Sequence, residues 1–275
     1  MKFSFGLRGH DIGDNFEEMC TKAKEAGITK LQFAMAKTMS DVDFDEVGYD
    51  IGLSEKVKTQ LDSYNLEVSV LGCYINPVNP NKDALEKELT RFKNFLHYAK
   101  DFNAGVVGTE TGVLQTIEAS QSEENYLTLV ENLRPLVKEA EKLGVVIGIE
   151  PVYPTAIKSP QRMKRLLDDL GSDNVGVILD VSNLTYSETR YMQSDIINDA
   201  FDLFGEKIKV IHLKDFIFDE NQKSFAPVGS GELMCELLLD RISMLNHTPD
   251  IILDESKLEL YKDSVSALND IIENQ

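Results

Sequence analysis

Four apolar segments in the second half of the chain each carry, at or near their carboxyl end, a residue that can bind a metal ion or move a proton. These residues are Glu150, Asp180, His212 and the pair Asp254-Glu255. Carboxylates and imidazoles are common ligands of divalent cations and common proton carriers. A single acidic residue after an apolar run is usually a helix cap or a solvated side chain. Four in succession predict a shared site if the fold brings the segment ends together.

Three carboxylates in one small volume would repel one another strongly unless a cation lay between them. Three oxygen ligands and one nitrogen ligand suit Mn²⁺, Mg²⁺ or Co²⁺, and Zn²⁺ is a further candidate. Adjacent residues of a strand point to opposite faces, so only one member of the last pair faces the metal. Register with the preceding apolar run favours Asp254. The pattern therefore predicts a metal held by Glu150, Asp180, His212 and Asp254.

The segments that must position these residues are short and rich in β-branched side chains, which is typical of buried parallel strands. The predicted strands are Phe3–Leu7, Lys30–Phe33, Glu67–Leu71, Val106–Gly108, Val145–Ile149, Val175–Leu179, Ile208–Leu213 and Ile251–Leu253. Amphipathic stretches with apolar residues at three- and four-residue spacing lie between them and predict helices. Gly27, Gly105 and Gly144 stand where left-handed helix caps are expected.

Eight strand–helix repeats follow one another without a linker or a low-complexity segment, which predicts a parallel sheet. We expect residues 1–275 to form a single (β/α)₈ barrel domain, since such barrels need about 250 residues. An open doubly wound sheet would require a GxGxxG turn after an early strand, and Arg8-Gly9-His10-Asp11 stands there instead. In a barrel, functional residues gather at the carboxyl ends of the strands.

Composition narrows the class of partner. The 275 residues carry a net charge of -19, which repels nucleic acids and anionic membrane surfaces. The three cysteines are far apart, so neither a disulfide framework nor a zinc knot is expected. Residues 1–13 do not resemble a signal peptide, and no apolar run is long enough to span a membrane. We expect a cytoplasmic protein whose partner is a small molecule. Assembly into a homo-oligomer through exposed barrel helices is left as an open alternative.

Several segments resemble the sugar phosphate isomerase/epimerase proteins of the xylose-isomerase-like barrel superfamily. They are LRGHD (7–11), VLGCYINPVNP (70–80), VVGTETG (106–112), GIEPV (148–152), GVILDVSNL (176–184), IKVIHLKDF (208–216) and PVGSGEL (227–233). The resemblance implies a metal site of Glu, Asp, His and Glu on the fifth to eighth strands. Glu150, Asp180 and His212 match that set, whereas Asp254 stands where the family carries Glu.

The resemblance also implies an activity. Such a protein is expected to isomerise or epimerise a small sugar, phosphorylated or not, through an enediolate. Glu150 would remove the proton beside the carbonyl, and Asp254 would return one from the opposite face. Asn183 lies where some 3-epimerases of the superfamily carry a histidine, which speaks against that particular activity.

Five further residues are candidates for substrate binding, and four of them also have a structural interpretation. His10 could make a loop hydrogen bond, and Asn76 could be a turn residue. Glu110 could brace a loop, and Lys214 could be a solvated side chain at a strand end. The candidates are His10, Asn76, Glu110, Asn183 and Lys214. The glycine loop at 227–232 could bind an anion or simply be a tight turn before a helix.

Three other functions compete with this hypothesis. A lyase of the inosose-dehydratase type would use the same metal and the same enolate chemistry. An endonuclease IV-like hydrolase would need a richer histidine set than the four present here and a surface that attracts DNA. A sugar-binding protein without catalysis is the third, because Asp254 departs from the family's glutamate.

Overall fold

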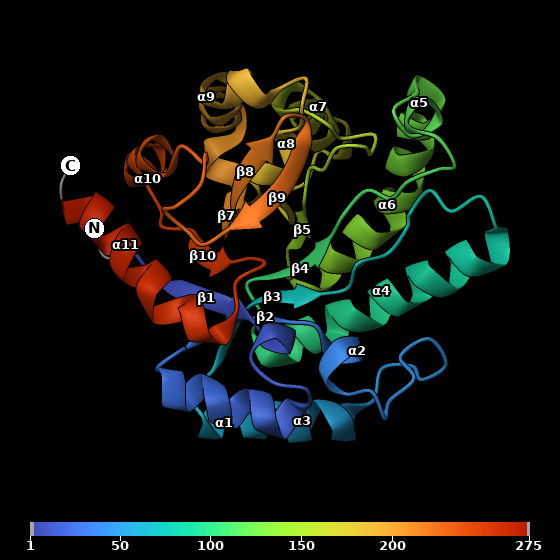
Figure 1. Ribbon diagram of the computed structural model, residues 1–275. Coiled ribbons are helices and arrows are strands. Elements are labelled where there is room, and N and C mark those ends of the chain that lie inside the picture. The colour runs from blue at the N-terminus through green and yellow to red at the C-terminus, as the bar shows by residue number, and fades with distance from the viewer. Residues whose placement is uncertain (1–2, 274–275) are drawn as a thin grey trace.

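Eight apolar segments form parallel strands that close into a barrel, as the sequence predicts (Figure 1). The computed structural model describes residues 3–273. The barrel strands are β1 Phe5–Arg8, β2 Lys30–Phe33, β3 Glu67–Gly72, β4 Val106–Thr109, β5 Ile147–Ile149, β6 Val175–Leu179, β7 Ile208–Leu213 and β10 Asp250–Leu253. Each strand pairs with its neighbours in the sequence of repeats, and β1 pairs with β10 to close the ring.

Helices surround the barrel on the outside (Figure 1). They are α1 Phe16–Ala26, α2 Met35–Thr38, α3 Ile51–Ser63, α4 Lys82–Phe102, α5 Ile117–Ser120, α6 Glu123–Leu143, α7 Pro160–Leu170, α8 Val181–Leu184, α9 Gln193–Phe204, α10 Cys235–Ser243 and α11 Tyr261–Glu273. Gly27 and Gly144 end α1 and α6 in the left-handed conformation, as predicted. The predicted cap at Gly105 is wrong, because Asn103 (φ 53°) ends α4 and the Gly105 amide already bonds to β3.

A two-stranded hairpin, β8 (Asp215–Asp219) and β9 (Gln222–Ala226), follows β7 and was not predicted from the sequence. Its strands are antiparallel and alternate little between buried and exposed positions, so the pattern carries no clear periodic signal. In Figure 1 it stands beside the carboxyl ends of β7 and β10. The hairpin borders the carboxyl-end face of the barrel, where the Phe225 ring lies 5.3 Å from the Lys214 ammonium group.

Two apolar layers hold the fold together. A small cluster fills the barrel lumen, and a large one packs the strands against the helices. The lumen cluster consists of Val70, Val106, Ile178, Val210 and Ile252. Gly148 faces the same space, where an added Cβ would come 2.8 Å from a methyl carbon of Val106. The lumen is therefore a packed core, with room for a ligand only above it at the strand ends.

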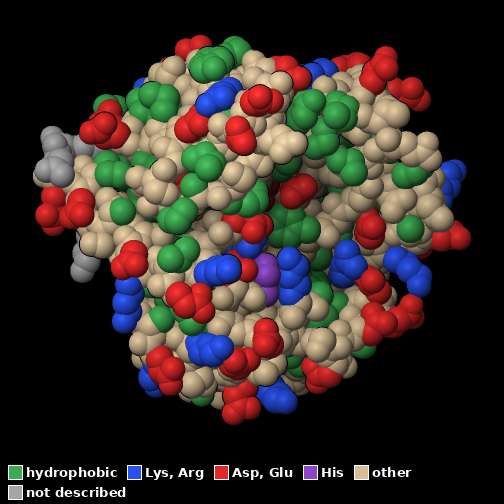
Figure 2. All heavy atoms as spheres, viewed as in Figure 1, with side chains coloured by type: hydrophobic (Ala, Val, Ile, Leu, Met, Phe, Trp, Pro, Cys, Tyr) green, Lys and Arg blue, Asp and Glu red, His purple; other side chains and the backbone are tan. Residues whose placement is uncertain are grey.

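The surface mixes acidic and basic groups around a central hollow (Figure 2). Among residues 3–273, none of the helices is both long enough and apolar enough to cross a membrane.

Candidate metal centre and active site

The alternation of side chains along each strand determines which residues face the barrel lumen. Val210 belongs to the lumen cluster, so His212 and Lys214 point the same way from β7 and its end. Together with side chains from the ends of the other strands and the segments just beyond them, they line one cavity of about 490 Å³ at the carboxyl ends. The lining side chains include Arg8, Gln32, Tyr74, Glu110, Glu150, His212, Lys214 and Asp254.

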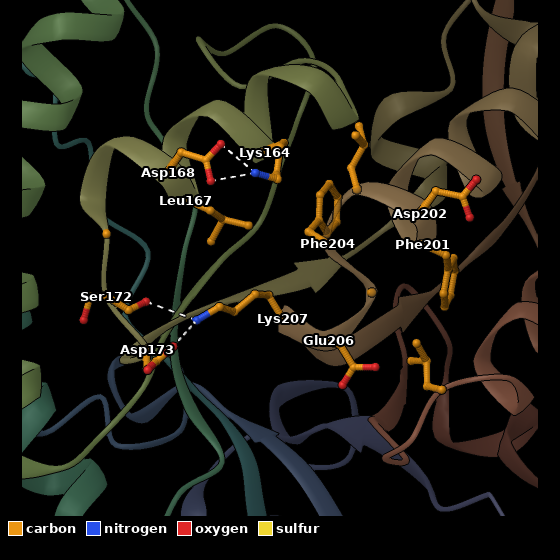
Figure 3. Close-up of a pocket in the computed structure, with 14 residues that line it drawn as sticks. Lys164, Leu167, Asp168, Ser172, Asp173, Phe201, Asp202, Phe204, Glu206 and Lys207 are labelled. Atoms are coloured by element: carbon orange, nitrogen blue, oxygen red, sulfur yellow. Dashed lines mark hydrogen bonds and ion pairs between the residues drawn. The ribbon is translucent and has the colours of Figure 1, made fainter.

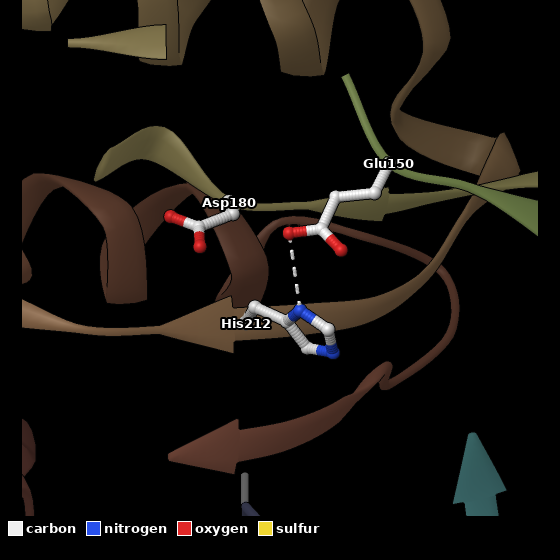
Figure 4. A group of neighbouring side chains, drawn as sticks. All are labelled: Glu150, Asp180 and His212. Carbon is white, nitrogen blue, oxygen red and sulfur yellow. Dashed lines mark ion pairs between the residues drawn. The ribbon is translucent and has the colours of Figure 1, made fainter. Parts of the chain in front are cut away.

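Glu150, Asp180 and His212 come together at the bottom of this site (Figure 4). One potential ligand atom of each lies within 4.8 Å of those of the other two. All three side chains are buried, at 3%, 0% and 2% exposure. The Nδ1 atom of His212 lies 3.3 Å from Oε1 of Glu150. The residues that the sequence places at the ends of three adjacent strands therefore share one small volume.

The chemistry of the three side chains fits a divalent cation. Oδ2 of Asp180 and Nε2 of His212 are buried, and in the described part of the chain neither makes a hydrogen bond, although Oδ2 forms an ion pair of 3.0 Å with the Lys214 ammonium group. One oxygen of each carboxylate and one ring nitrogen of His212 lie close enough together to share a divalent cation, which would take over the contact that the Lys214 ammonium group now makes with Asp180. Two carboxylates and one imidazole form a donor set that Mn²⁺, Mg²⁺ and Zn²⁺ all accept.

Neighbouring side chains hold Glu150 in place. Asn183 donates a hydrogen bond of 2.7 Å from Nδ2 to Oε1 of Glu150. The Tyr74 hydroxyl donates to the other oxygen at 3.1 Å, and Gln32 donates to that hydroxyl at 3.2 Å. Because both oxygens accept hydrogen bonds, the orientation of the carboxylate is determined before any ligand binds.

Asp180 is oriented by the helix that follows it. It is the N-cap residue of α8, and its Oδ1 accepts a hydrogen bond from the backbone N–H of Asn183. Its Oδ2 lies 3.0 Å from the ammonium group of Lys214. Burial is the largest effect on this carboxyl and raises its pKa, although Lys214 acts in the opposite direction.

Asp254 faces the lumen, one pleat above His212. His212 pairs in register with Ile252, so Asp254 stands level with Lys214. Each of its oxygens meets a cation, Lys214 at 2.9 Å and Arg8 at 2.8 Å. Burial alone would raise its pKa, but Lys214, His212 and Arg8 together lower it to about 2.

Glu255 lies at the exposed edge of the site. It adopts a left-handed conformation (φ 50°), and its carboxylate contacts Arg8 at 2.8 Å. Both acidic residues after β10 therefore meet Arg8, but only Asp254 is buried. The role of Asp254 as a fourth metal ligand stays a prediction.

The electrostatic balance of His212 depends on Glu150. Burial disfavours the charged imidazole, but the nearby carboxylates of Glu150, Asp254 and Asp180 outweigh it and raise the pKa of His212. The same negative groups raise the pKa of Lys214 in spite of its burial, so that side chain keeps its charge. The site collects several acidic groups that a cation would stabilise.

A profile of the xylose isomerase-like TIM barrel family matches residues 20–271. The chain belongs to this family. No curated protein sequence matches it. A crystal structure of a D-tagatose 3-epimerase-like protein is similar, with a TM-score of 0.81 and 15% identity over 99% of this chain and 98% of that one.

Two further solved structures extend the comparison. A xylose isomerase-like TIM barrel protein from Mycobacterium smegmatis in complex with magnesium has a TM-score of 0.76 and 15% identity over 99% of this chain and 97% of that one. A probable 3-DHS dehydratase from Bacillus anthracis has a TM-score of 0.73 and 15% identity over 98% and 99%. At these identities the likeness concerns the fold alone.

The structure of this xylose isomerase-like barrel brings the predicted substrate-binding residues to the cavity. His10, Asn76, Glu110, Asn183 and Lys214 all line it. Asn183 and Lys214 contact the triad residues directly, as described above. Burial, with a further contribution from Glu150, raises the pKa of Glu110 to about 7. A carboxyl group of this kind is partly protonated near neutral pH.

The hydrogen bonds of Asn76 support its interpretation as a turn residue. Its Oδ1 accepts a hydrogen bond from the Val78 amide, and its Nδ2 donates to the Val113 carbonyl at 2.9 Å. Both polar groups of the side chain thus brace the loops after β3 and β4. Whether Asn76 also binds a substrate stays a prediction.

The glycine loop after the hairpin is organised by Asp215. Its Oδ2 accepts hydrogen bonds from the amides of Gly229 and Gly231, and its Oδ1 from that of Leu233. An anion bound at this loop would need the same backbone N–H groups as hydrogen-bond donors. The structure therefore favours a structural turn over an anion site at 227–232.

Four polar side chains of the site were not predicted from the sequence: Arg8, Gln32, Lys37 and Tyr74. Arg8 and Gln32 lie at or near the ends of β1 and β2 and reach the cavity. Both would have been identified by taking every second residue along those predicted strands, which are the residues that share one face. Tyr74 lies two residues beyond the end of β3, and Lys37 lies in the short helix α2, for which no strand rule applies.

A second cavity, of about 580 Å³, lies between α7 and α9 at the amino ends of β6 and β7 (Figure 3). Its lysines are already paired, Lys164 with Asp168 and Lys207 with Asp173, at 2.6 and 2.7 Å. It lies at the end of the barrel that stabilises the fold rather than at the end that carries catalysis in this architecture. We therefore place the active site in the cavity above the triad.

Proposed function

We propose that this protein is a divalent-metal-dependent isomerase or epimerase of a small sugar that works by proton transfer through an enediolate. The observation that carries the proposal is the convergence of Glu150, Asp180 and His212 in a cavity at the carboxyl ends of the strands. Membership of the xylose isomerase-like family supports it, as does the likeness to a D-tagatose 3-epimerase-like protein.

Glu150, Asp180 and His212 would hold the metal, with Mn²⁺, Mg²⁺ or Co²⁺ as the first candidates and Zn²⁺ as a further one. When bound, a divalent cation polarises a substrate carbonyl and stabilises negative charge on its oxygen. The neighbour solved with magnesium agrees with a hard divalent ion. We propose Asp254 as an additional ligand once Lys214 moves away from it.

Glu150 would remove the proton from the carbon beside the carbonyl. Its two oxygens are held by Asn183 and Tyr74, which keeps the carboxylate aimed during the reaction. Lys214 would donate a hydrogen bond to an oxygen of the enediolate. Asp254, which is ionised in the resting site, would first take a proton from the Lys214 ammonium group or from water and would then deliver it to the opposite face of the same carbon.

A lyase is the second candidate, and one feature of the cavity favours it. Glu110 has a pKa raised to about 7 by burial and by Glu150, so it can donate a proton near neutral pH. Loss of a hydroxyl group as water from an enediolate requires such an acid. The probable dehydratase of similar fold is consistent with this alternative.

Substitution of Glu150 by Gln tests the main proposal. Because the variant keeps the shape of the side chain and removes the base, we expect kcat to fall by about 10² to 10⁴-fold while the circular dichroism spectrum is unchanged. The assay follows a panel of ketoses by proton NMR in D₂O with Mn²⁺ present. Glu25→Gln, an exposed change on α1, is the control and should keep full activity. A fully active Glu150→Gln enzyme would remove Glu150 from the mechanism.

The same spectra separate the two candidate reactions. Deuterium incorporation with a new sugar signal and no loss of water indicates an isomerase or epimerase. Formation of an unsaturated or deoxy product indicates a lyase, and in that case Glu110→Gln should abolish elimination.

A further inference from the structure

The β8–β9 hairpin contacts α8, the short helix that orients two residues of the active site. This helix spans only Val181–Leu184, and Asp180 of the triad is its N-cap residue. Asn183 lies within it and donates the hydrogen bond that holds Glu150. In Figure 1 the hairpin stands beside α8. The placement of α8 therefore determines where the Asp180 carboxylate points and where the Glu150 carboxylate is held.

Lys223 of β9 makes the contact between the hairpin and α8. Its ammonium group donates hydrogen bonds to the backbone carbonyls of Ser182 and Thr185, the latter at 3.0 Å. Both residues are 1% exposed. The last carbonyl groups of a helix need partners from outside it, and here the Thr185 N–H and Lys223 both donate to the Ser182 carbonyl. Lys223 thus closes α8 at the end opposite to Asp180.

Lys223 is itself held in a defined position. Its ammonium group lies 4.5 Å from the centre of the Phe216 ring, which is completely buried. Phe218, its partner in the hairpin register, donates its backbone N–H to Glu232, and Glu232 forms an ion pair of 2.8 Å with Arg190. Burial lowers the pKa of Lys223 to about 8, so the side chain is mostly an ammonium group at neutral pH. The hairpin can therefore act as a fixed support for α8.

The same face of the hairpin approaches the active site at a second point. Phe225 lies two residues beyond Lys223, so both side chains are on one face of β9. The Phe225 ring lies 5.3 Å from the ammonium group of Lys214, and that group lies 3.0 Å from Oδ2 of Asp180. The hairpin therefore reaches Asp180 by two routes, through α8 and through Lys214.

We infer that Lys223 is a positioning residue of the active site: by holding the carboxyl end of α8, it fixes Asp180 for the metal ion and Asn183 for the Glu150 carboxylate. Among the described residues, Lys223 does not line the cavity, so it acts through the backbone of α8 rather than by contact with a substrate. The inference rests on the proposed function, because it takes Asp180 and Glu150 to bind the metal.

The Mn²⁺ affinity of variants tests this role. Lys223→Met removes the N–H donors and keeps the apolar stem beside Phe216. We expect its Mn²⁺ affinity to fall by about ten-fold, as is common when a group that supports metal ligands is removed. Lys223→Arg still donates to carbonyl groups and should keep most of the affinity. Electron paramagnetic resonance of free Mn²⁺ measures the affinity, and circular dichroism checks that each variant is folded.

Lys207→Met is the matched control. Lys207 also donates a hydrogen bond to a backbone carbonyl, that of Ser172 at 3.3 Å, but at the opposite end of the barrel. This variant should keep the Mn²⁺ affinity of the wild type. A Lys223→Met protein that binds Mn²⁺ as tightly as the wild type would show that Lys223 only stabilises the hairpin, and it would overturn the inference.

Kinetics test the link from Lys223 to Glu150. With saturating Mn²⁺ and a ketose that the wild type converts, Lys223→Met should lower kcat by about ten-fold and change KM little. In an Asn183→Ala background the same change should have a much smaller effect on kcat, because the link through Asn183 is already broken. Strictly additive effects of the two changes would contradict the positioning role.

Failure of the proposed function gives a different result. A wild-type protein that binds no divalent cation would remove the proposed function and this inference with it. A wild-type protein that binds Mn²⁺ and exchanges protons, together with a Lys223→Met variant that does both equally well, would overturn the inference alone.

Discussion

Charged side chains of opposite sign alternate around the active site. Lys214 lies between Asp180 and Asp254, and Arg8 lies between Asp254 and Asp11. Buried charges are tolerated only when they are paired in this way. The arrangement also means that a metal ion competes with the Lys214 ammonium for the same carboxylates.

The role of Asp254 can be settled by metal affinity. Asp254→Asn keeps the size of the side chain but removes its charge, so we expect the Mn²⁺ affinity to fall by about ten-fold or more. Asp180→Asn, in the triad itself, should have at least as large an effect. Electron paramagnetic resonance of free Mn²⁺ measures both. An unchanged affinity in Asp254→Asn would leave Asp254 as an ion-pair partner of Lys214 and no ligand.

Strand geometry explains why the site is where it is. The lumen below the triad is filled by five apolar side chains, and a glycine such as Gly148 leaves the space that two of them occupy. Two residues further along these strands, on the face that points into the lumen, the side chains become polar. A change in the packing of the lumen should therefore affect stability first.

Gly148→Ala tests this packing. The added methyl group would lie 2.8 Å from Val106 and 3.0 Å from Ile178, so we expect a loss of about 1–3 kcal/mol in the free energy of unfolding. Urea denaturation measures the loss, and a second change, Val106→Ala, should restore part of it. Gly48→Ala, where nothing lies within 4 Å, should be nearly neutral. Equal effects of the two glycine changes would contradict the packing argument.

The whole molecule should be stabilised by the ion that its site binds. A ligand that binds only the folded state at a hundred times its Kd adds about 2.7 kcal/mol. For a chain of this size we expect Tm to rise by about 5–10 °C with Mn²⁺ and to fall again with EDTA. Differential scanning fluorimetry measures both changes. A Tm that does not respond to any divalent cation would speak against the metal centre.

The stabilisation should also depend on pH. The pKa values of Asp180 and His212 are raised in the metal-free protein, so both groups favour the folded state when protonated, and this contribution is lost as the pH rises. A metal ion needs both groups deprotonated. The increase in Tm caused by Mn²⁺ should therefore grow between about pH 5 and pH 8.

Much of the barrel could be predicted because its signals are local. The segments Lys30–Phe33, Val175–Leu179 and Ile208–Leu213 match the observed strands residue for residue. The strand ends then indicate Glu150 and Asp180 without any knowledge of distances. A short apolar run that is rich in β-branched residues and bounded by turn residues indicates a buried strand.

The predictions that failed or were missing concern features that apolar periodicity does not indicate. Asn103 rather than Gly105 ends α4, because the strand pairing of the next segment already uses the Gly105 amide. The β8–β9 hairpin lacks a periodic signal. Tyr74 and Lys37 reach the cavity from segments whose course is set by tertiary packing.

Local pattern was sufficient for the strands, for the closed barrel and for the residues that stand at its carboxyl end. Three-dimensional packing decided which atoms meet: the ion pairs of Asp254 with Arg8 and Lys214, the hydrogen bonds that hold Glu150, and the contact between Lys37 and His10. The physical reason is that strand alternation acts between adjacent residues, whereas a contact between two side chains depends on register, closure and loop path across the whole chain.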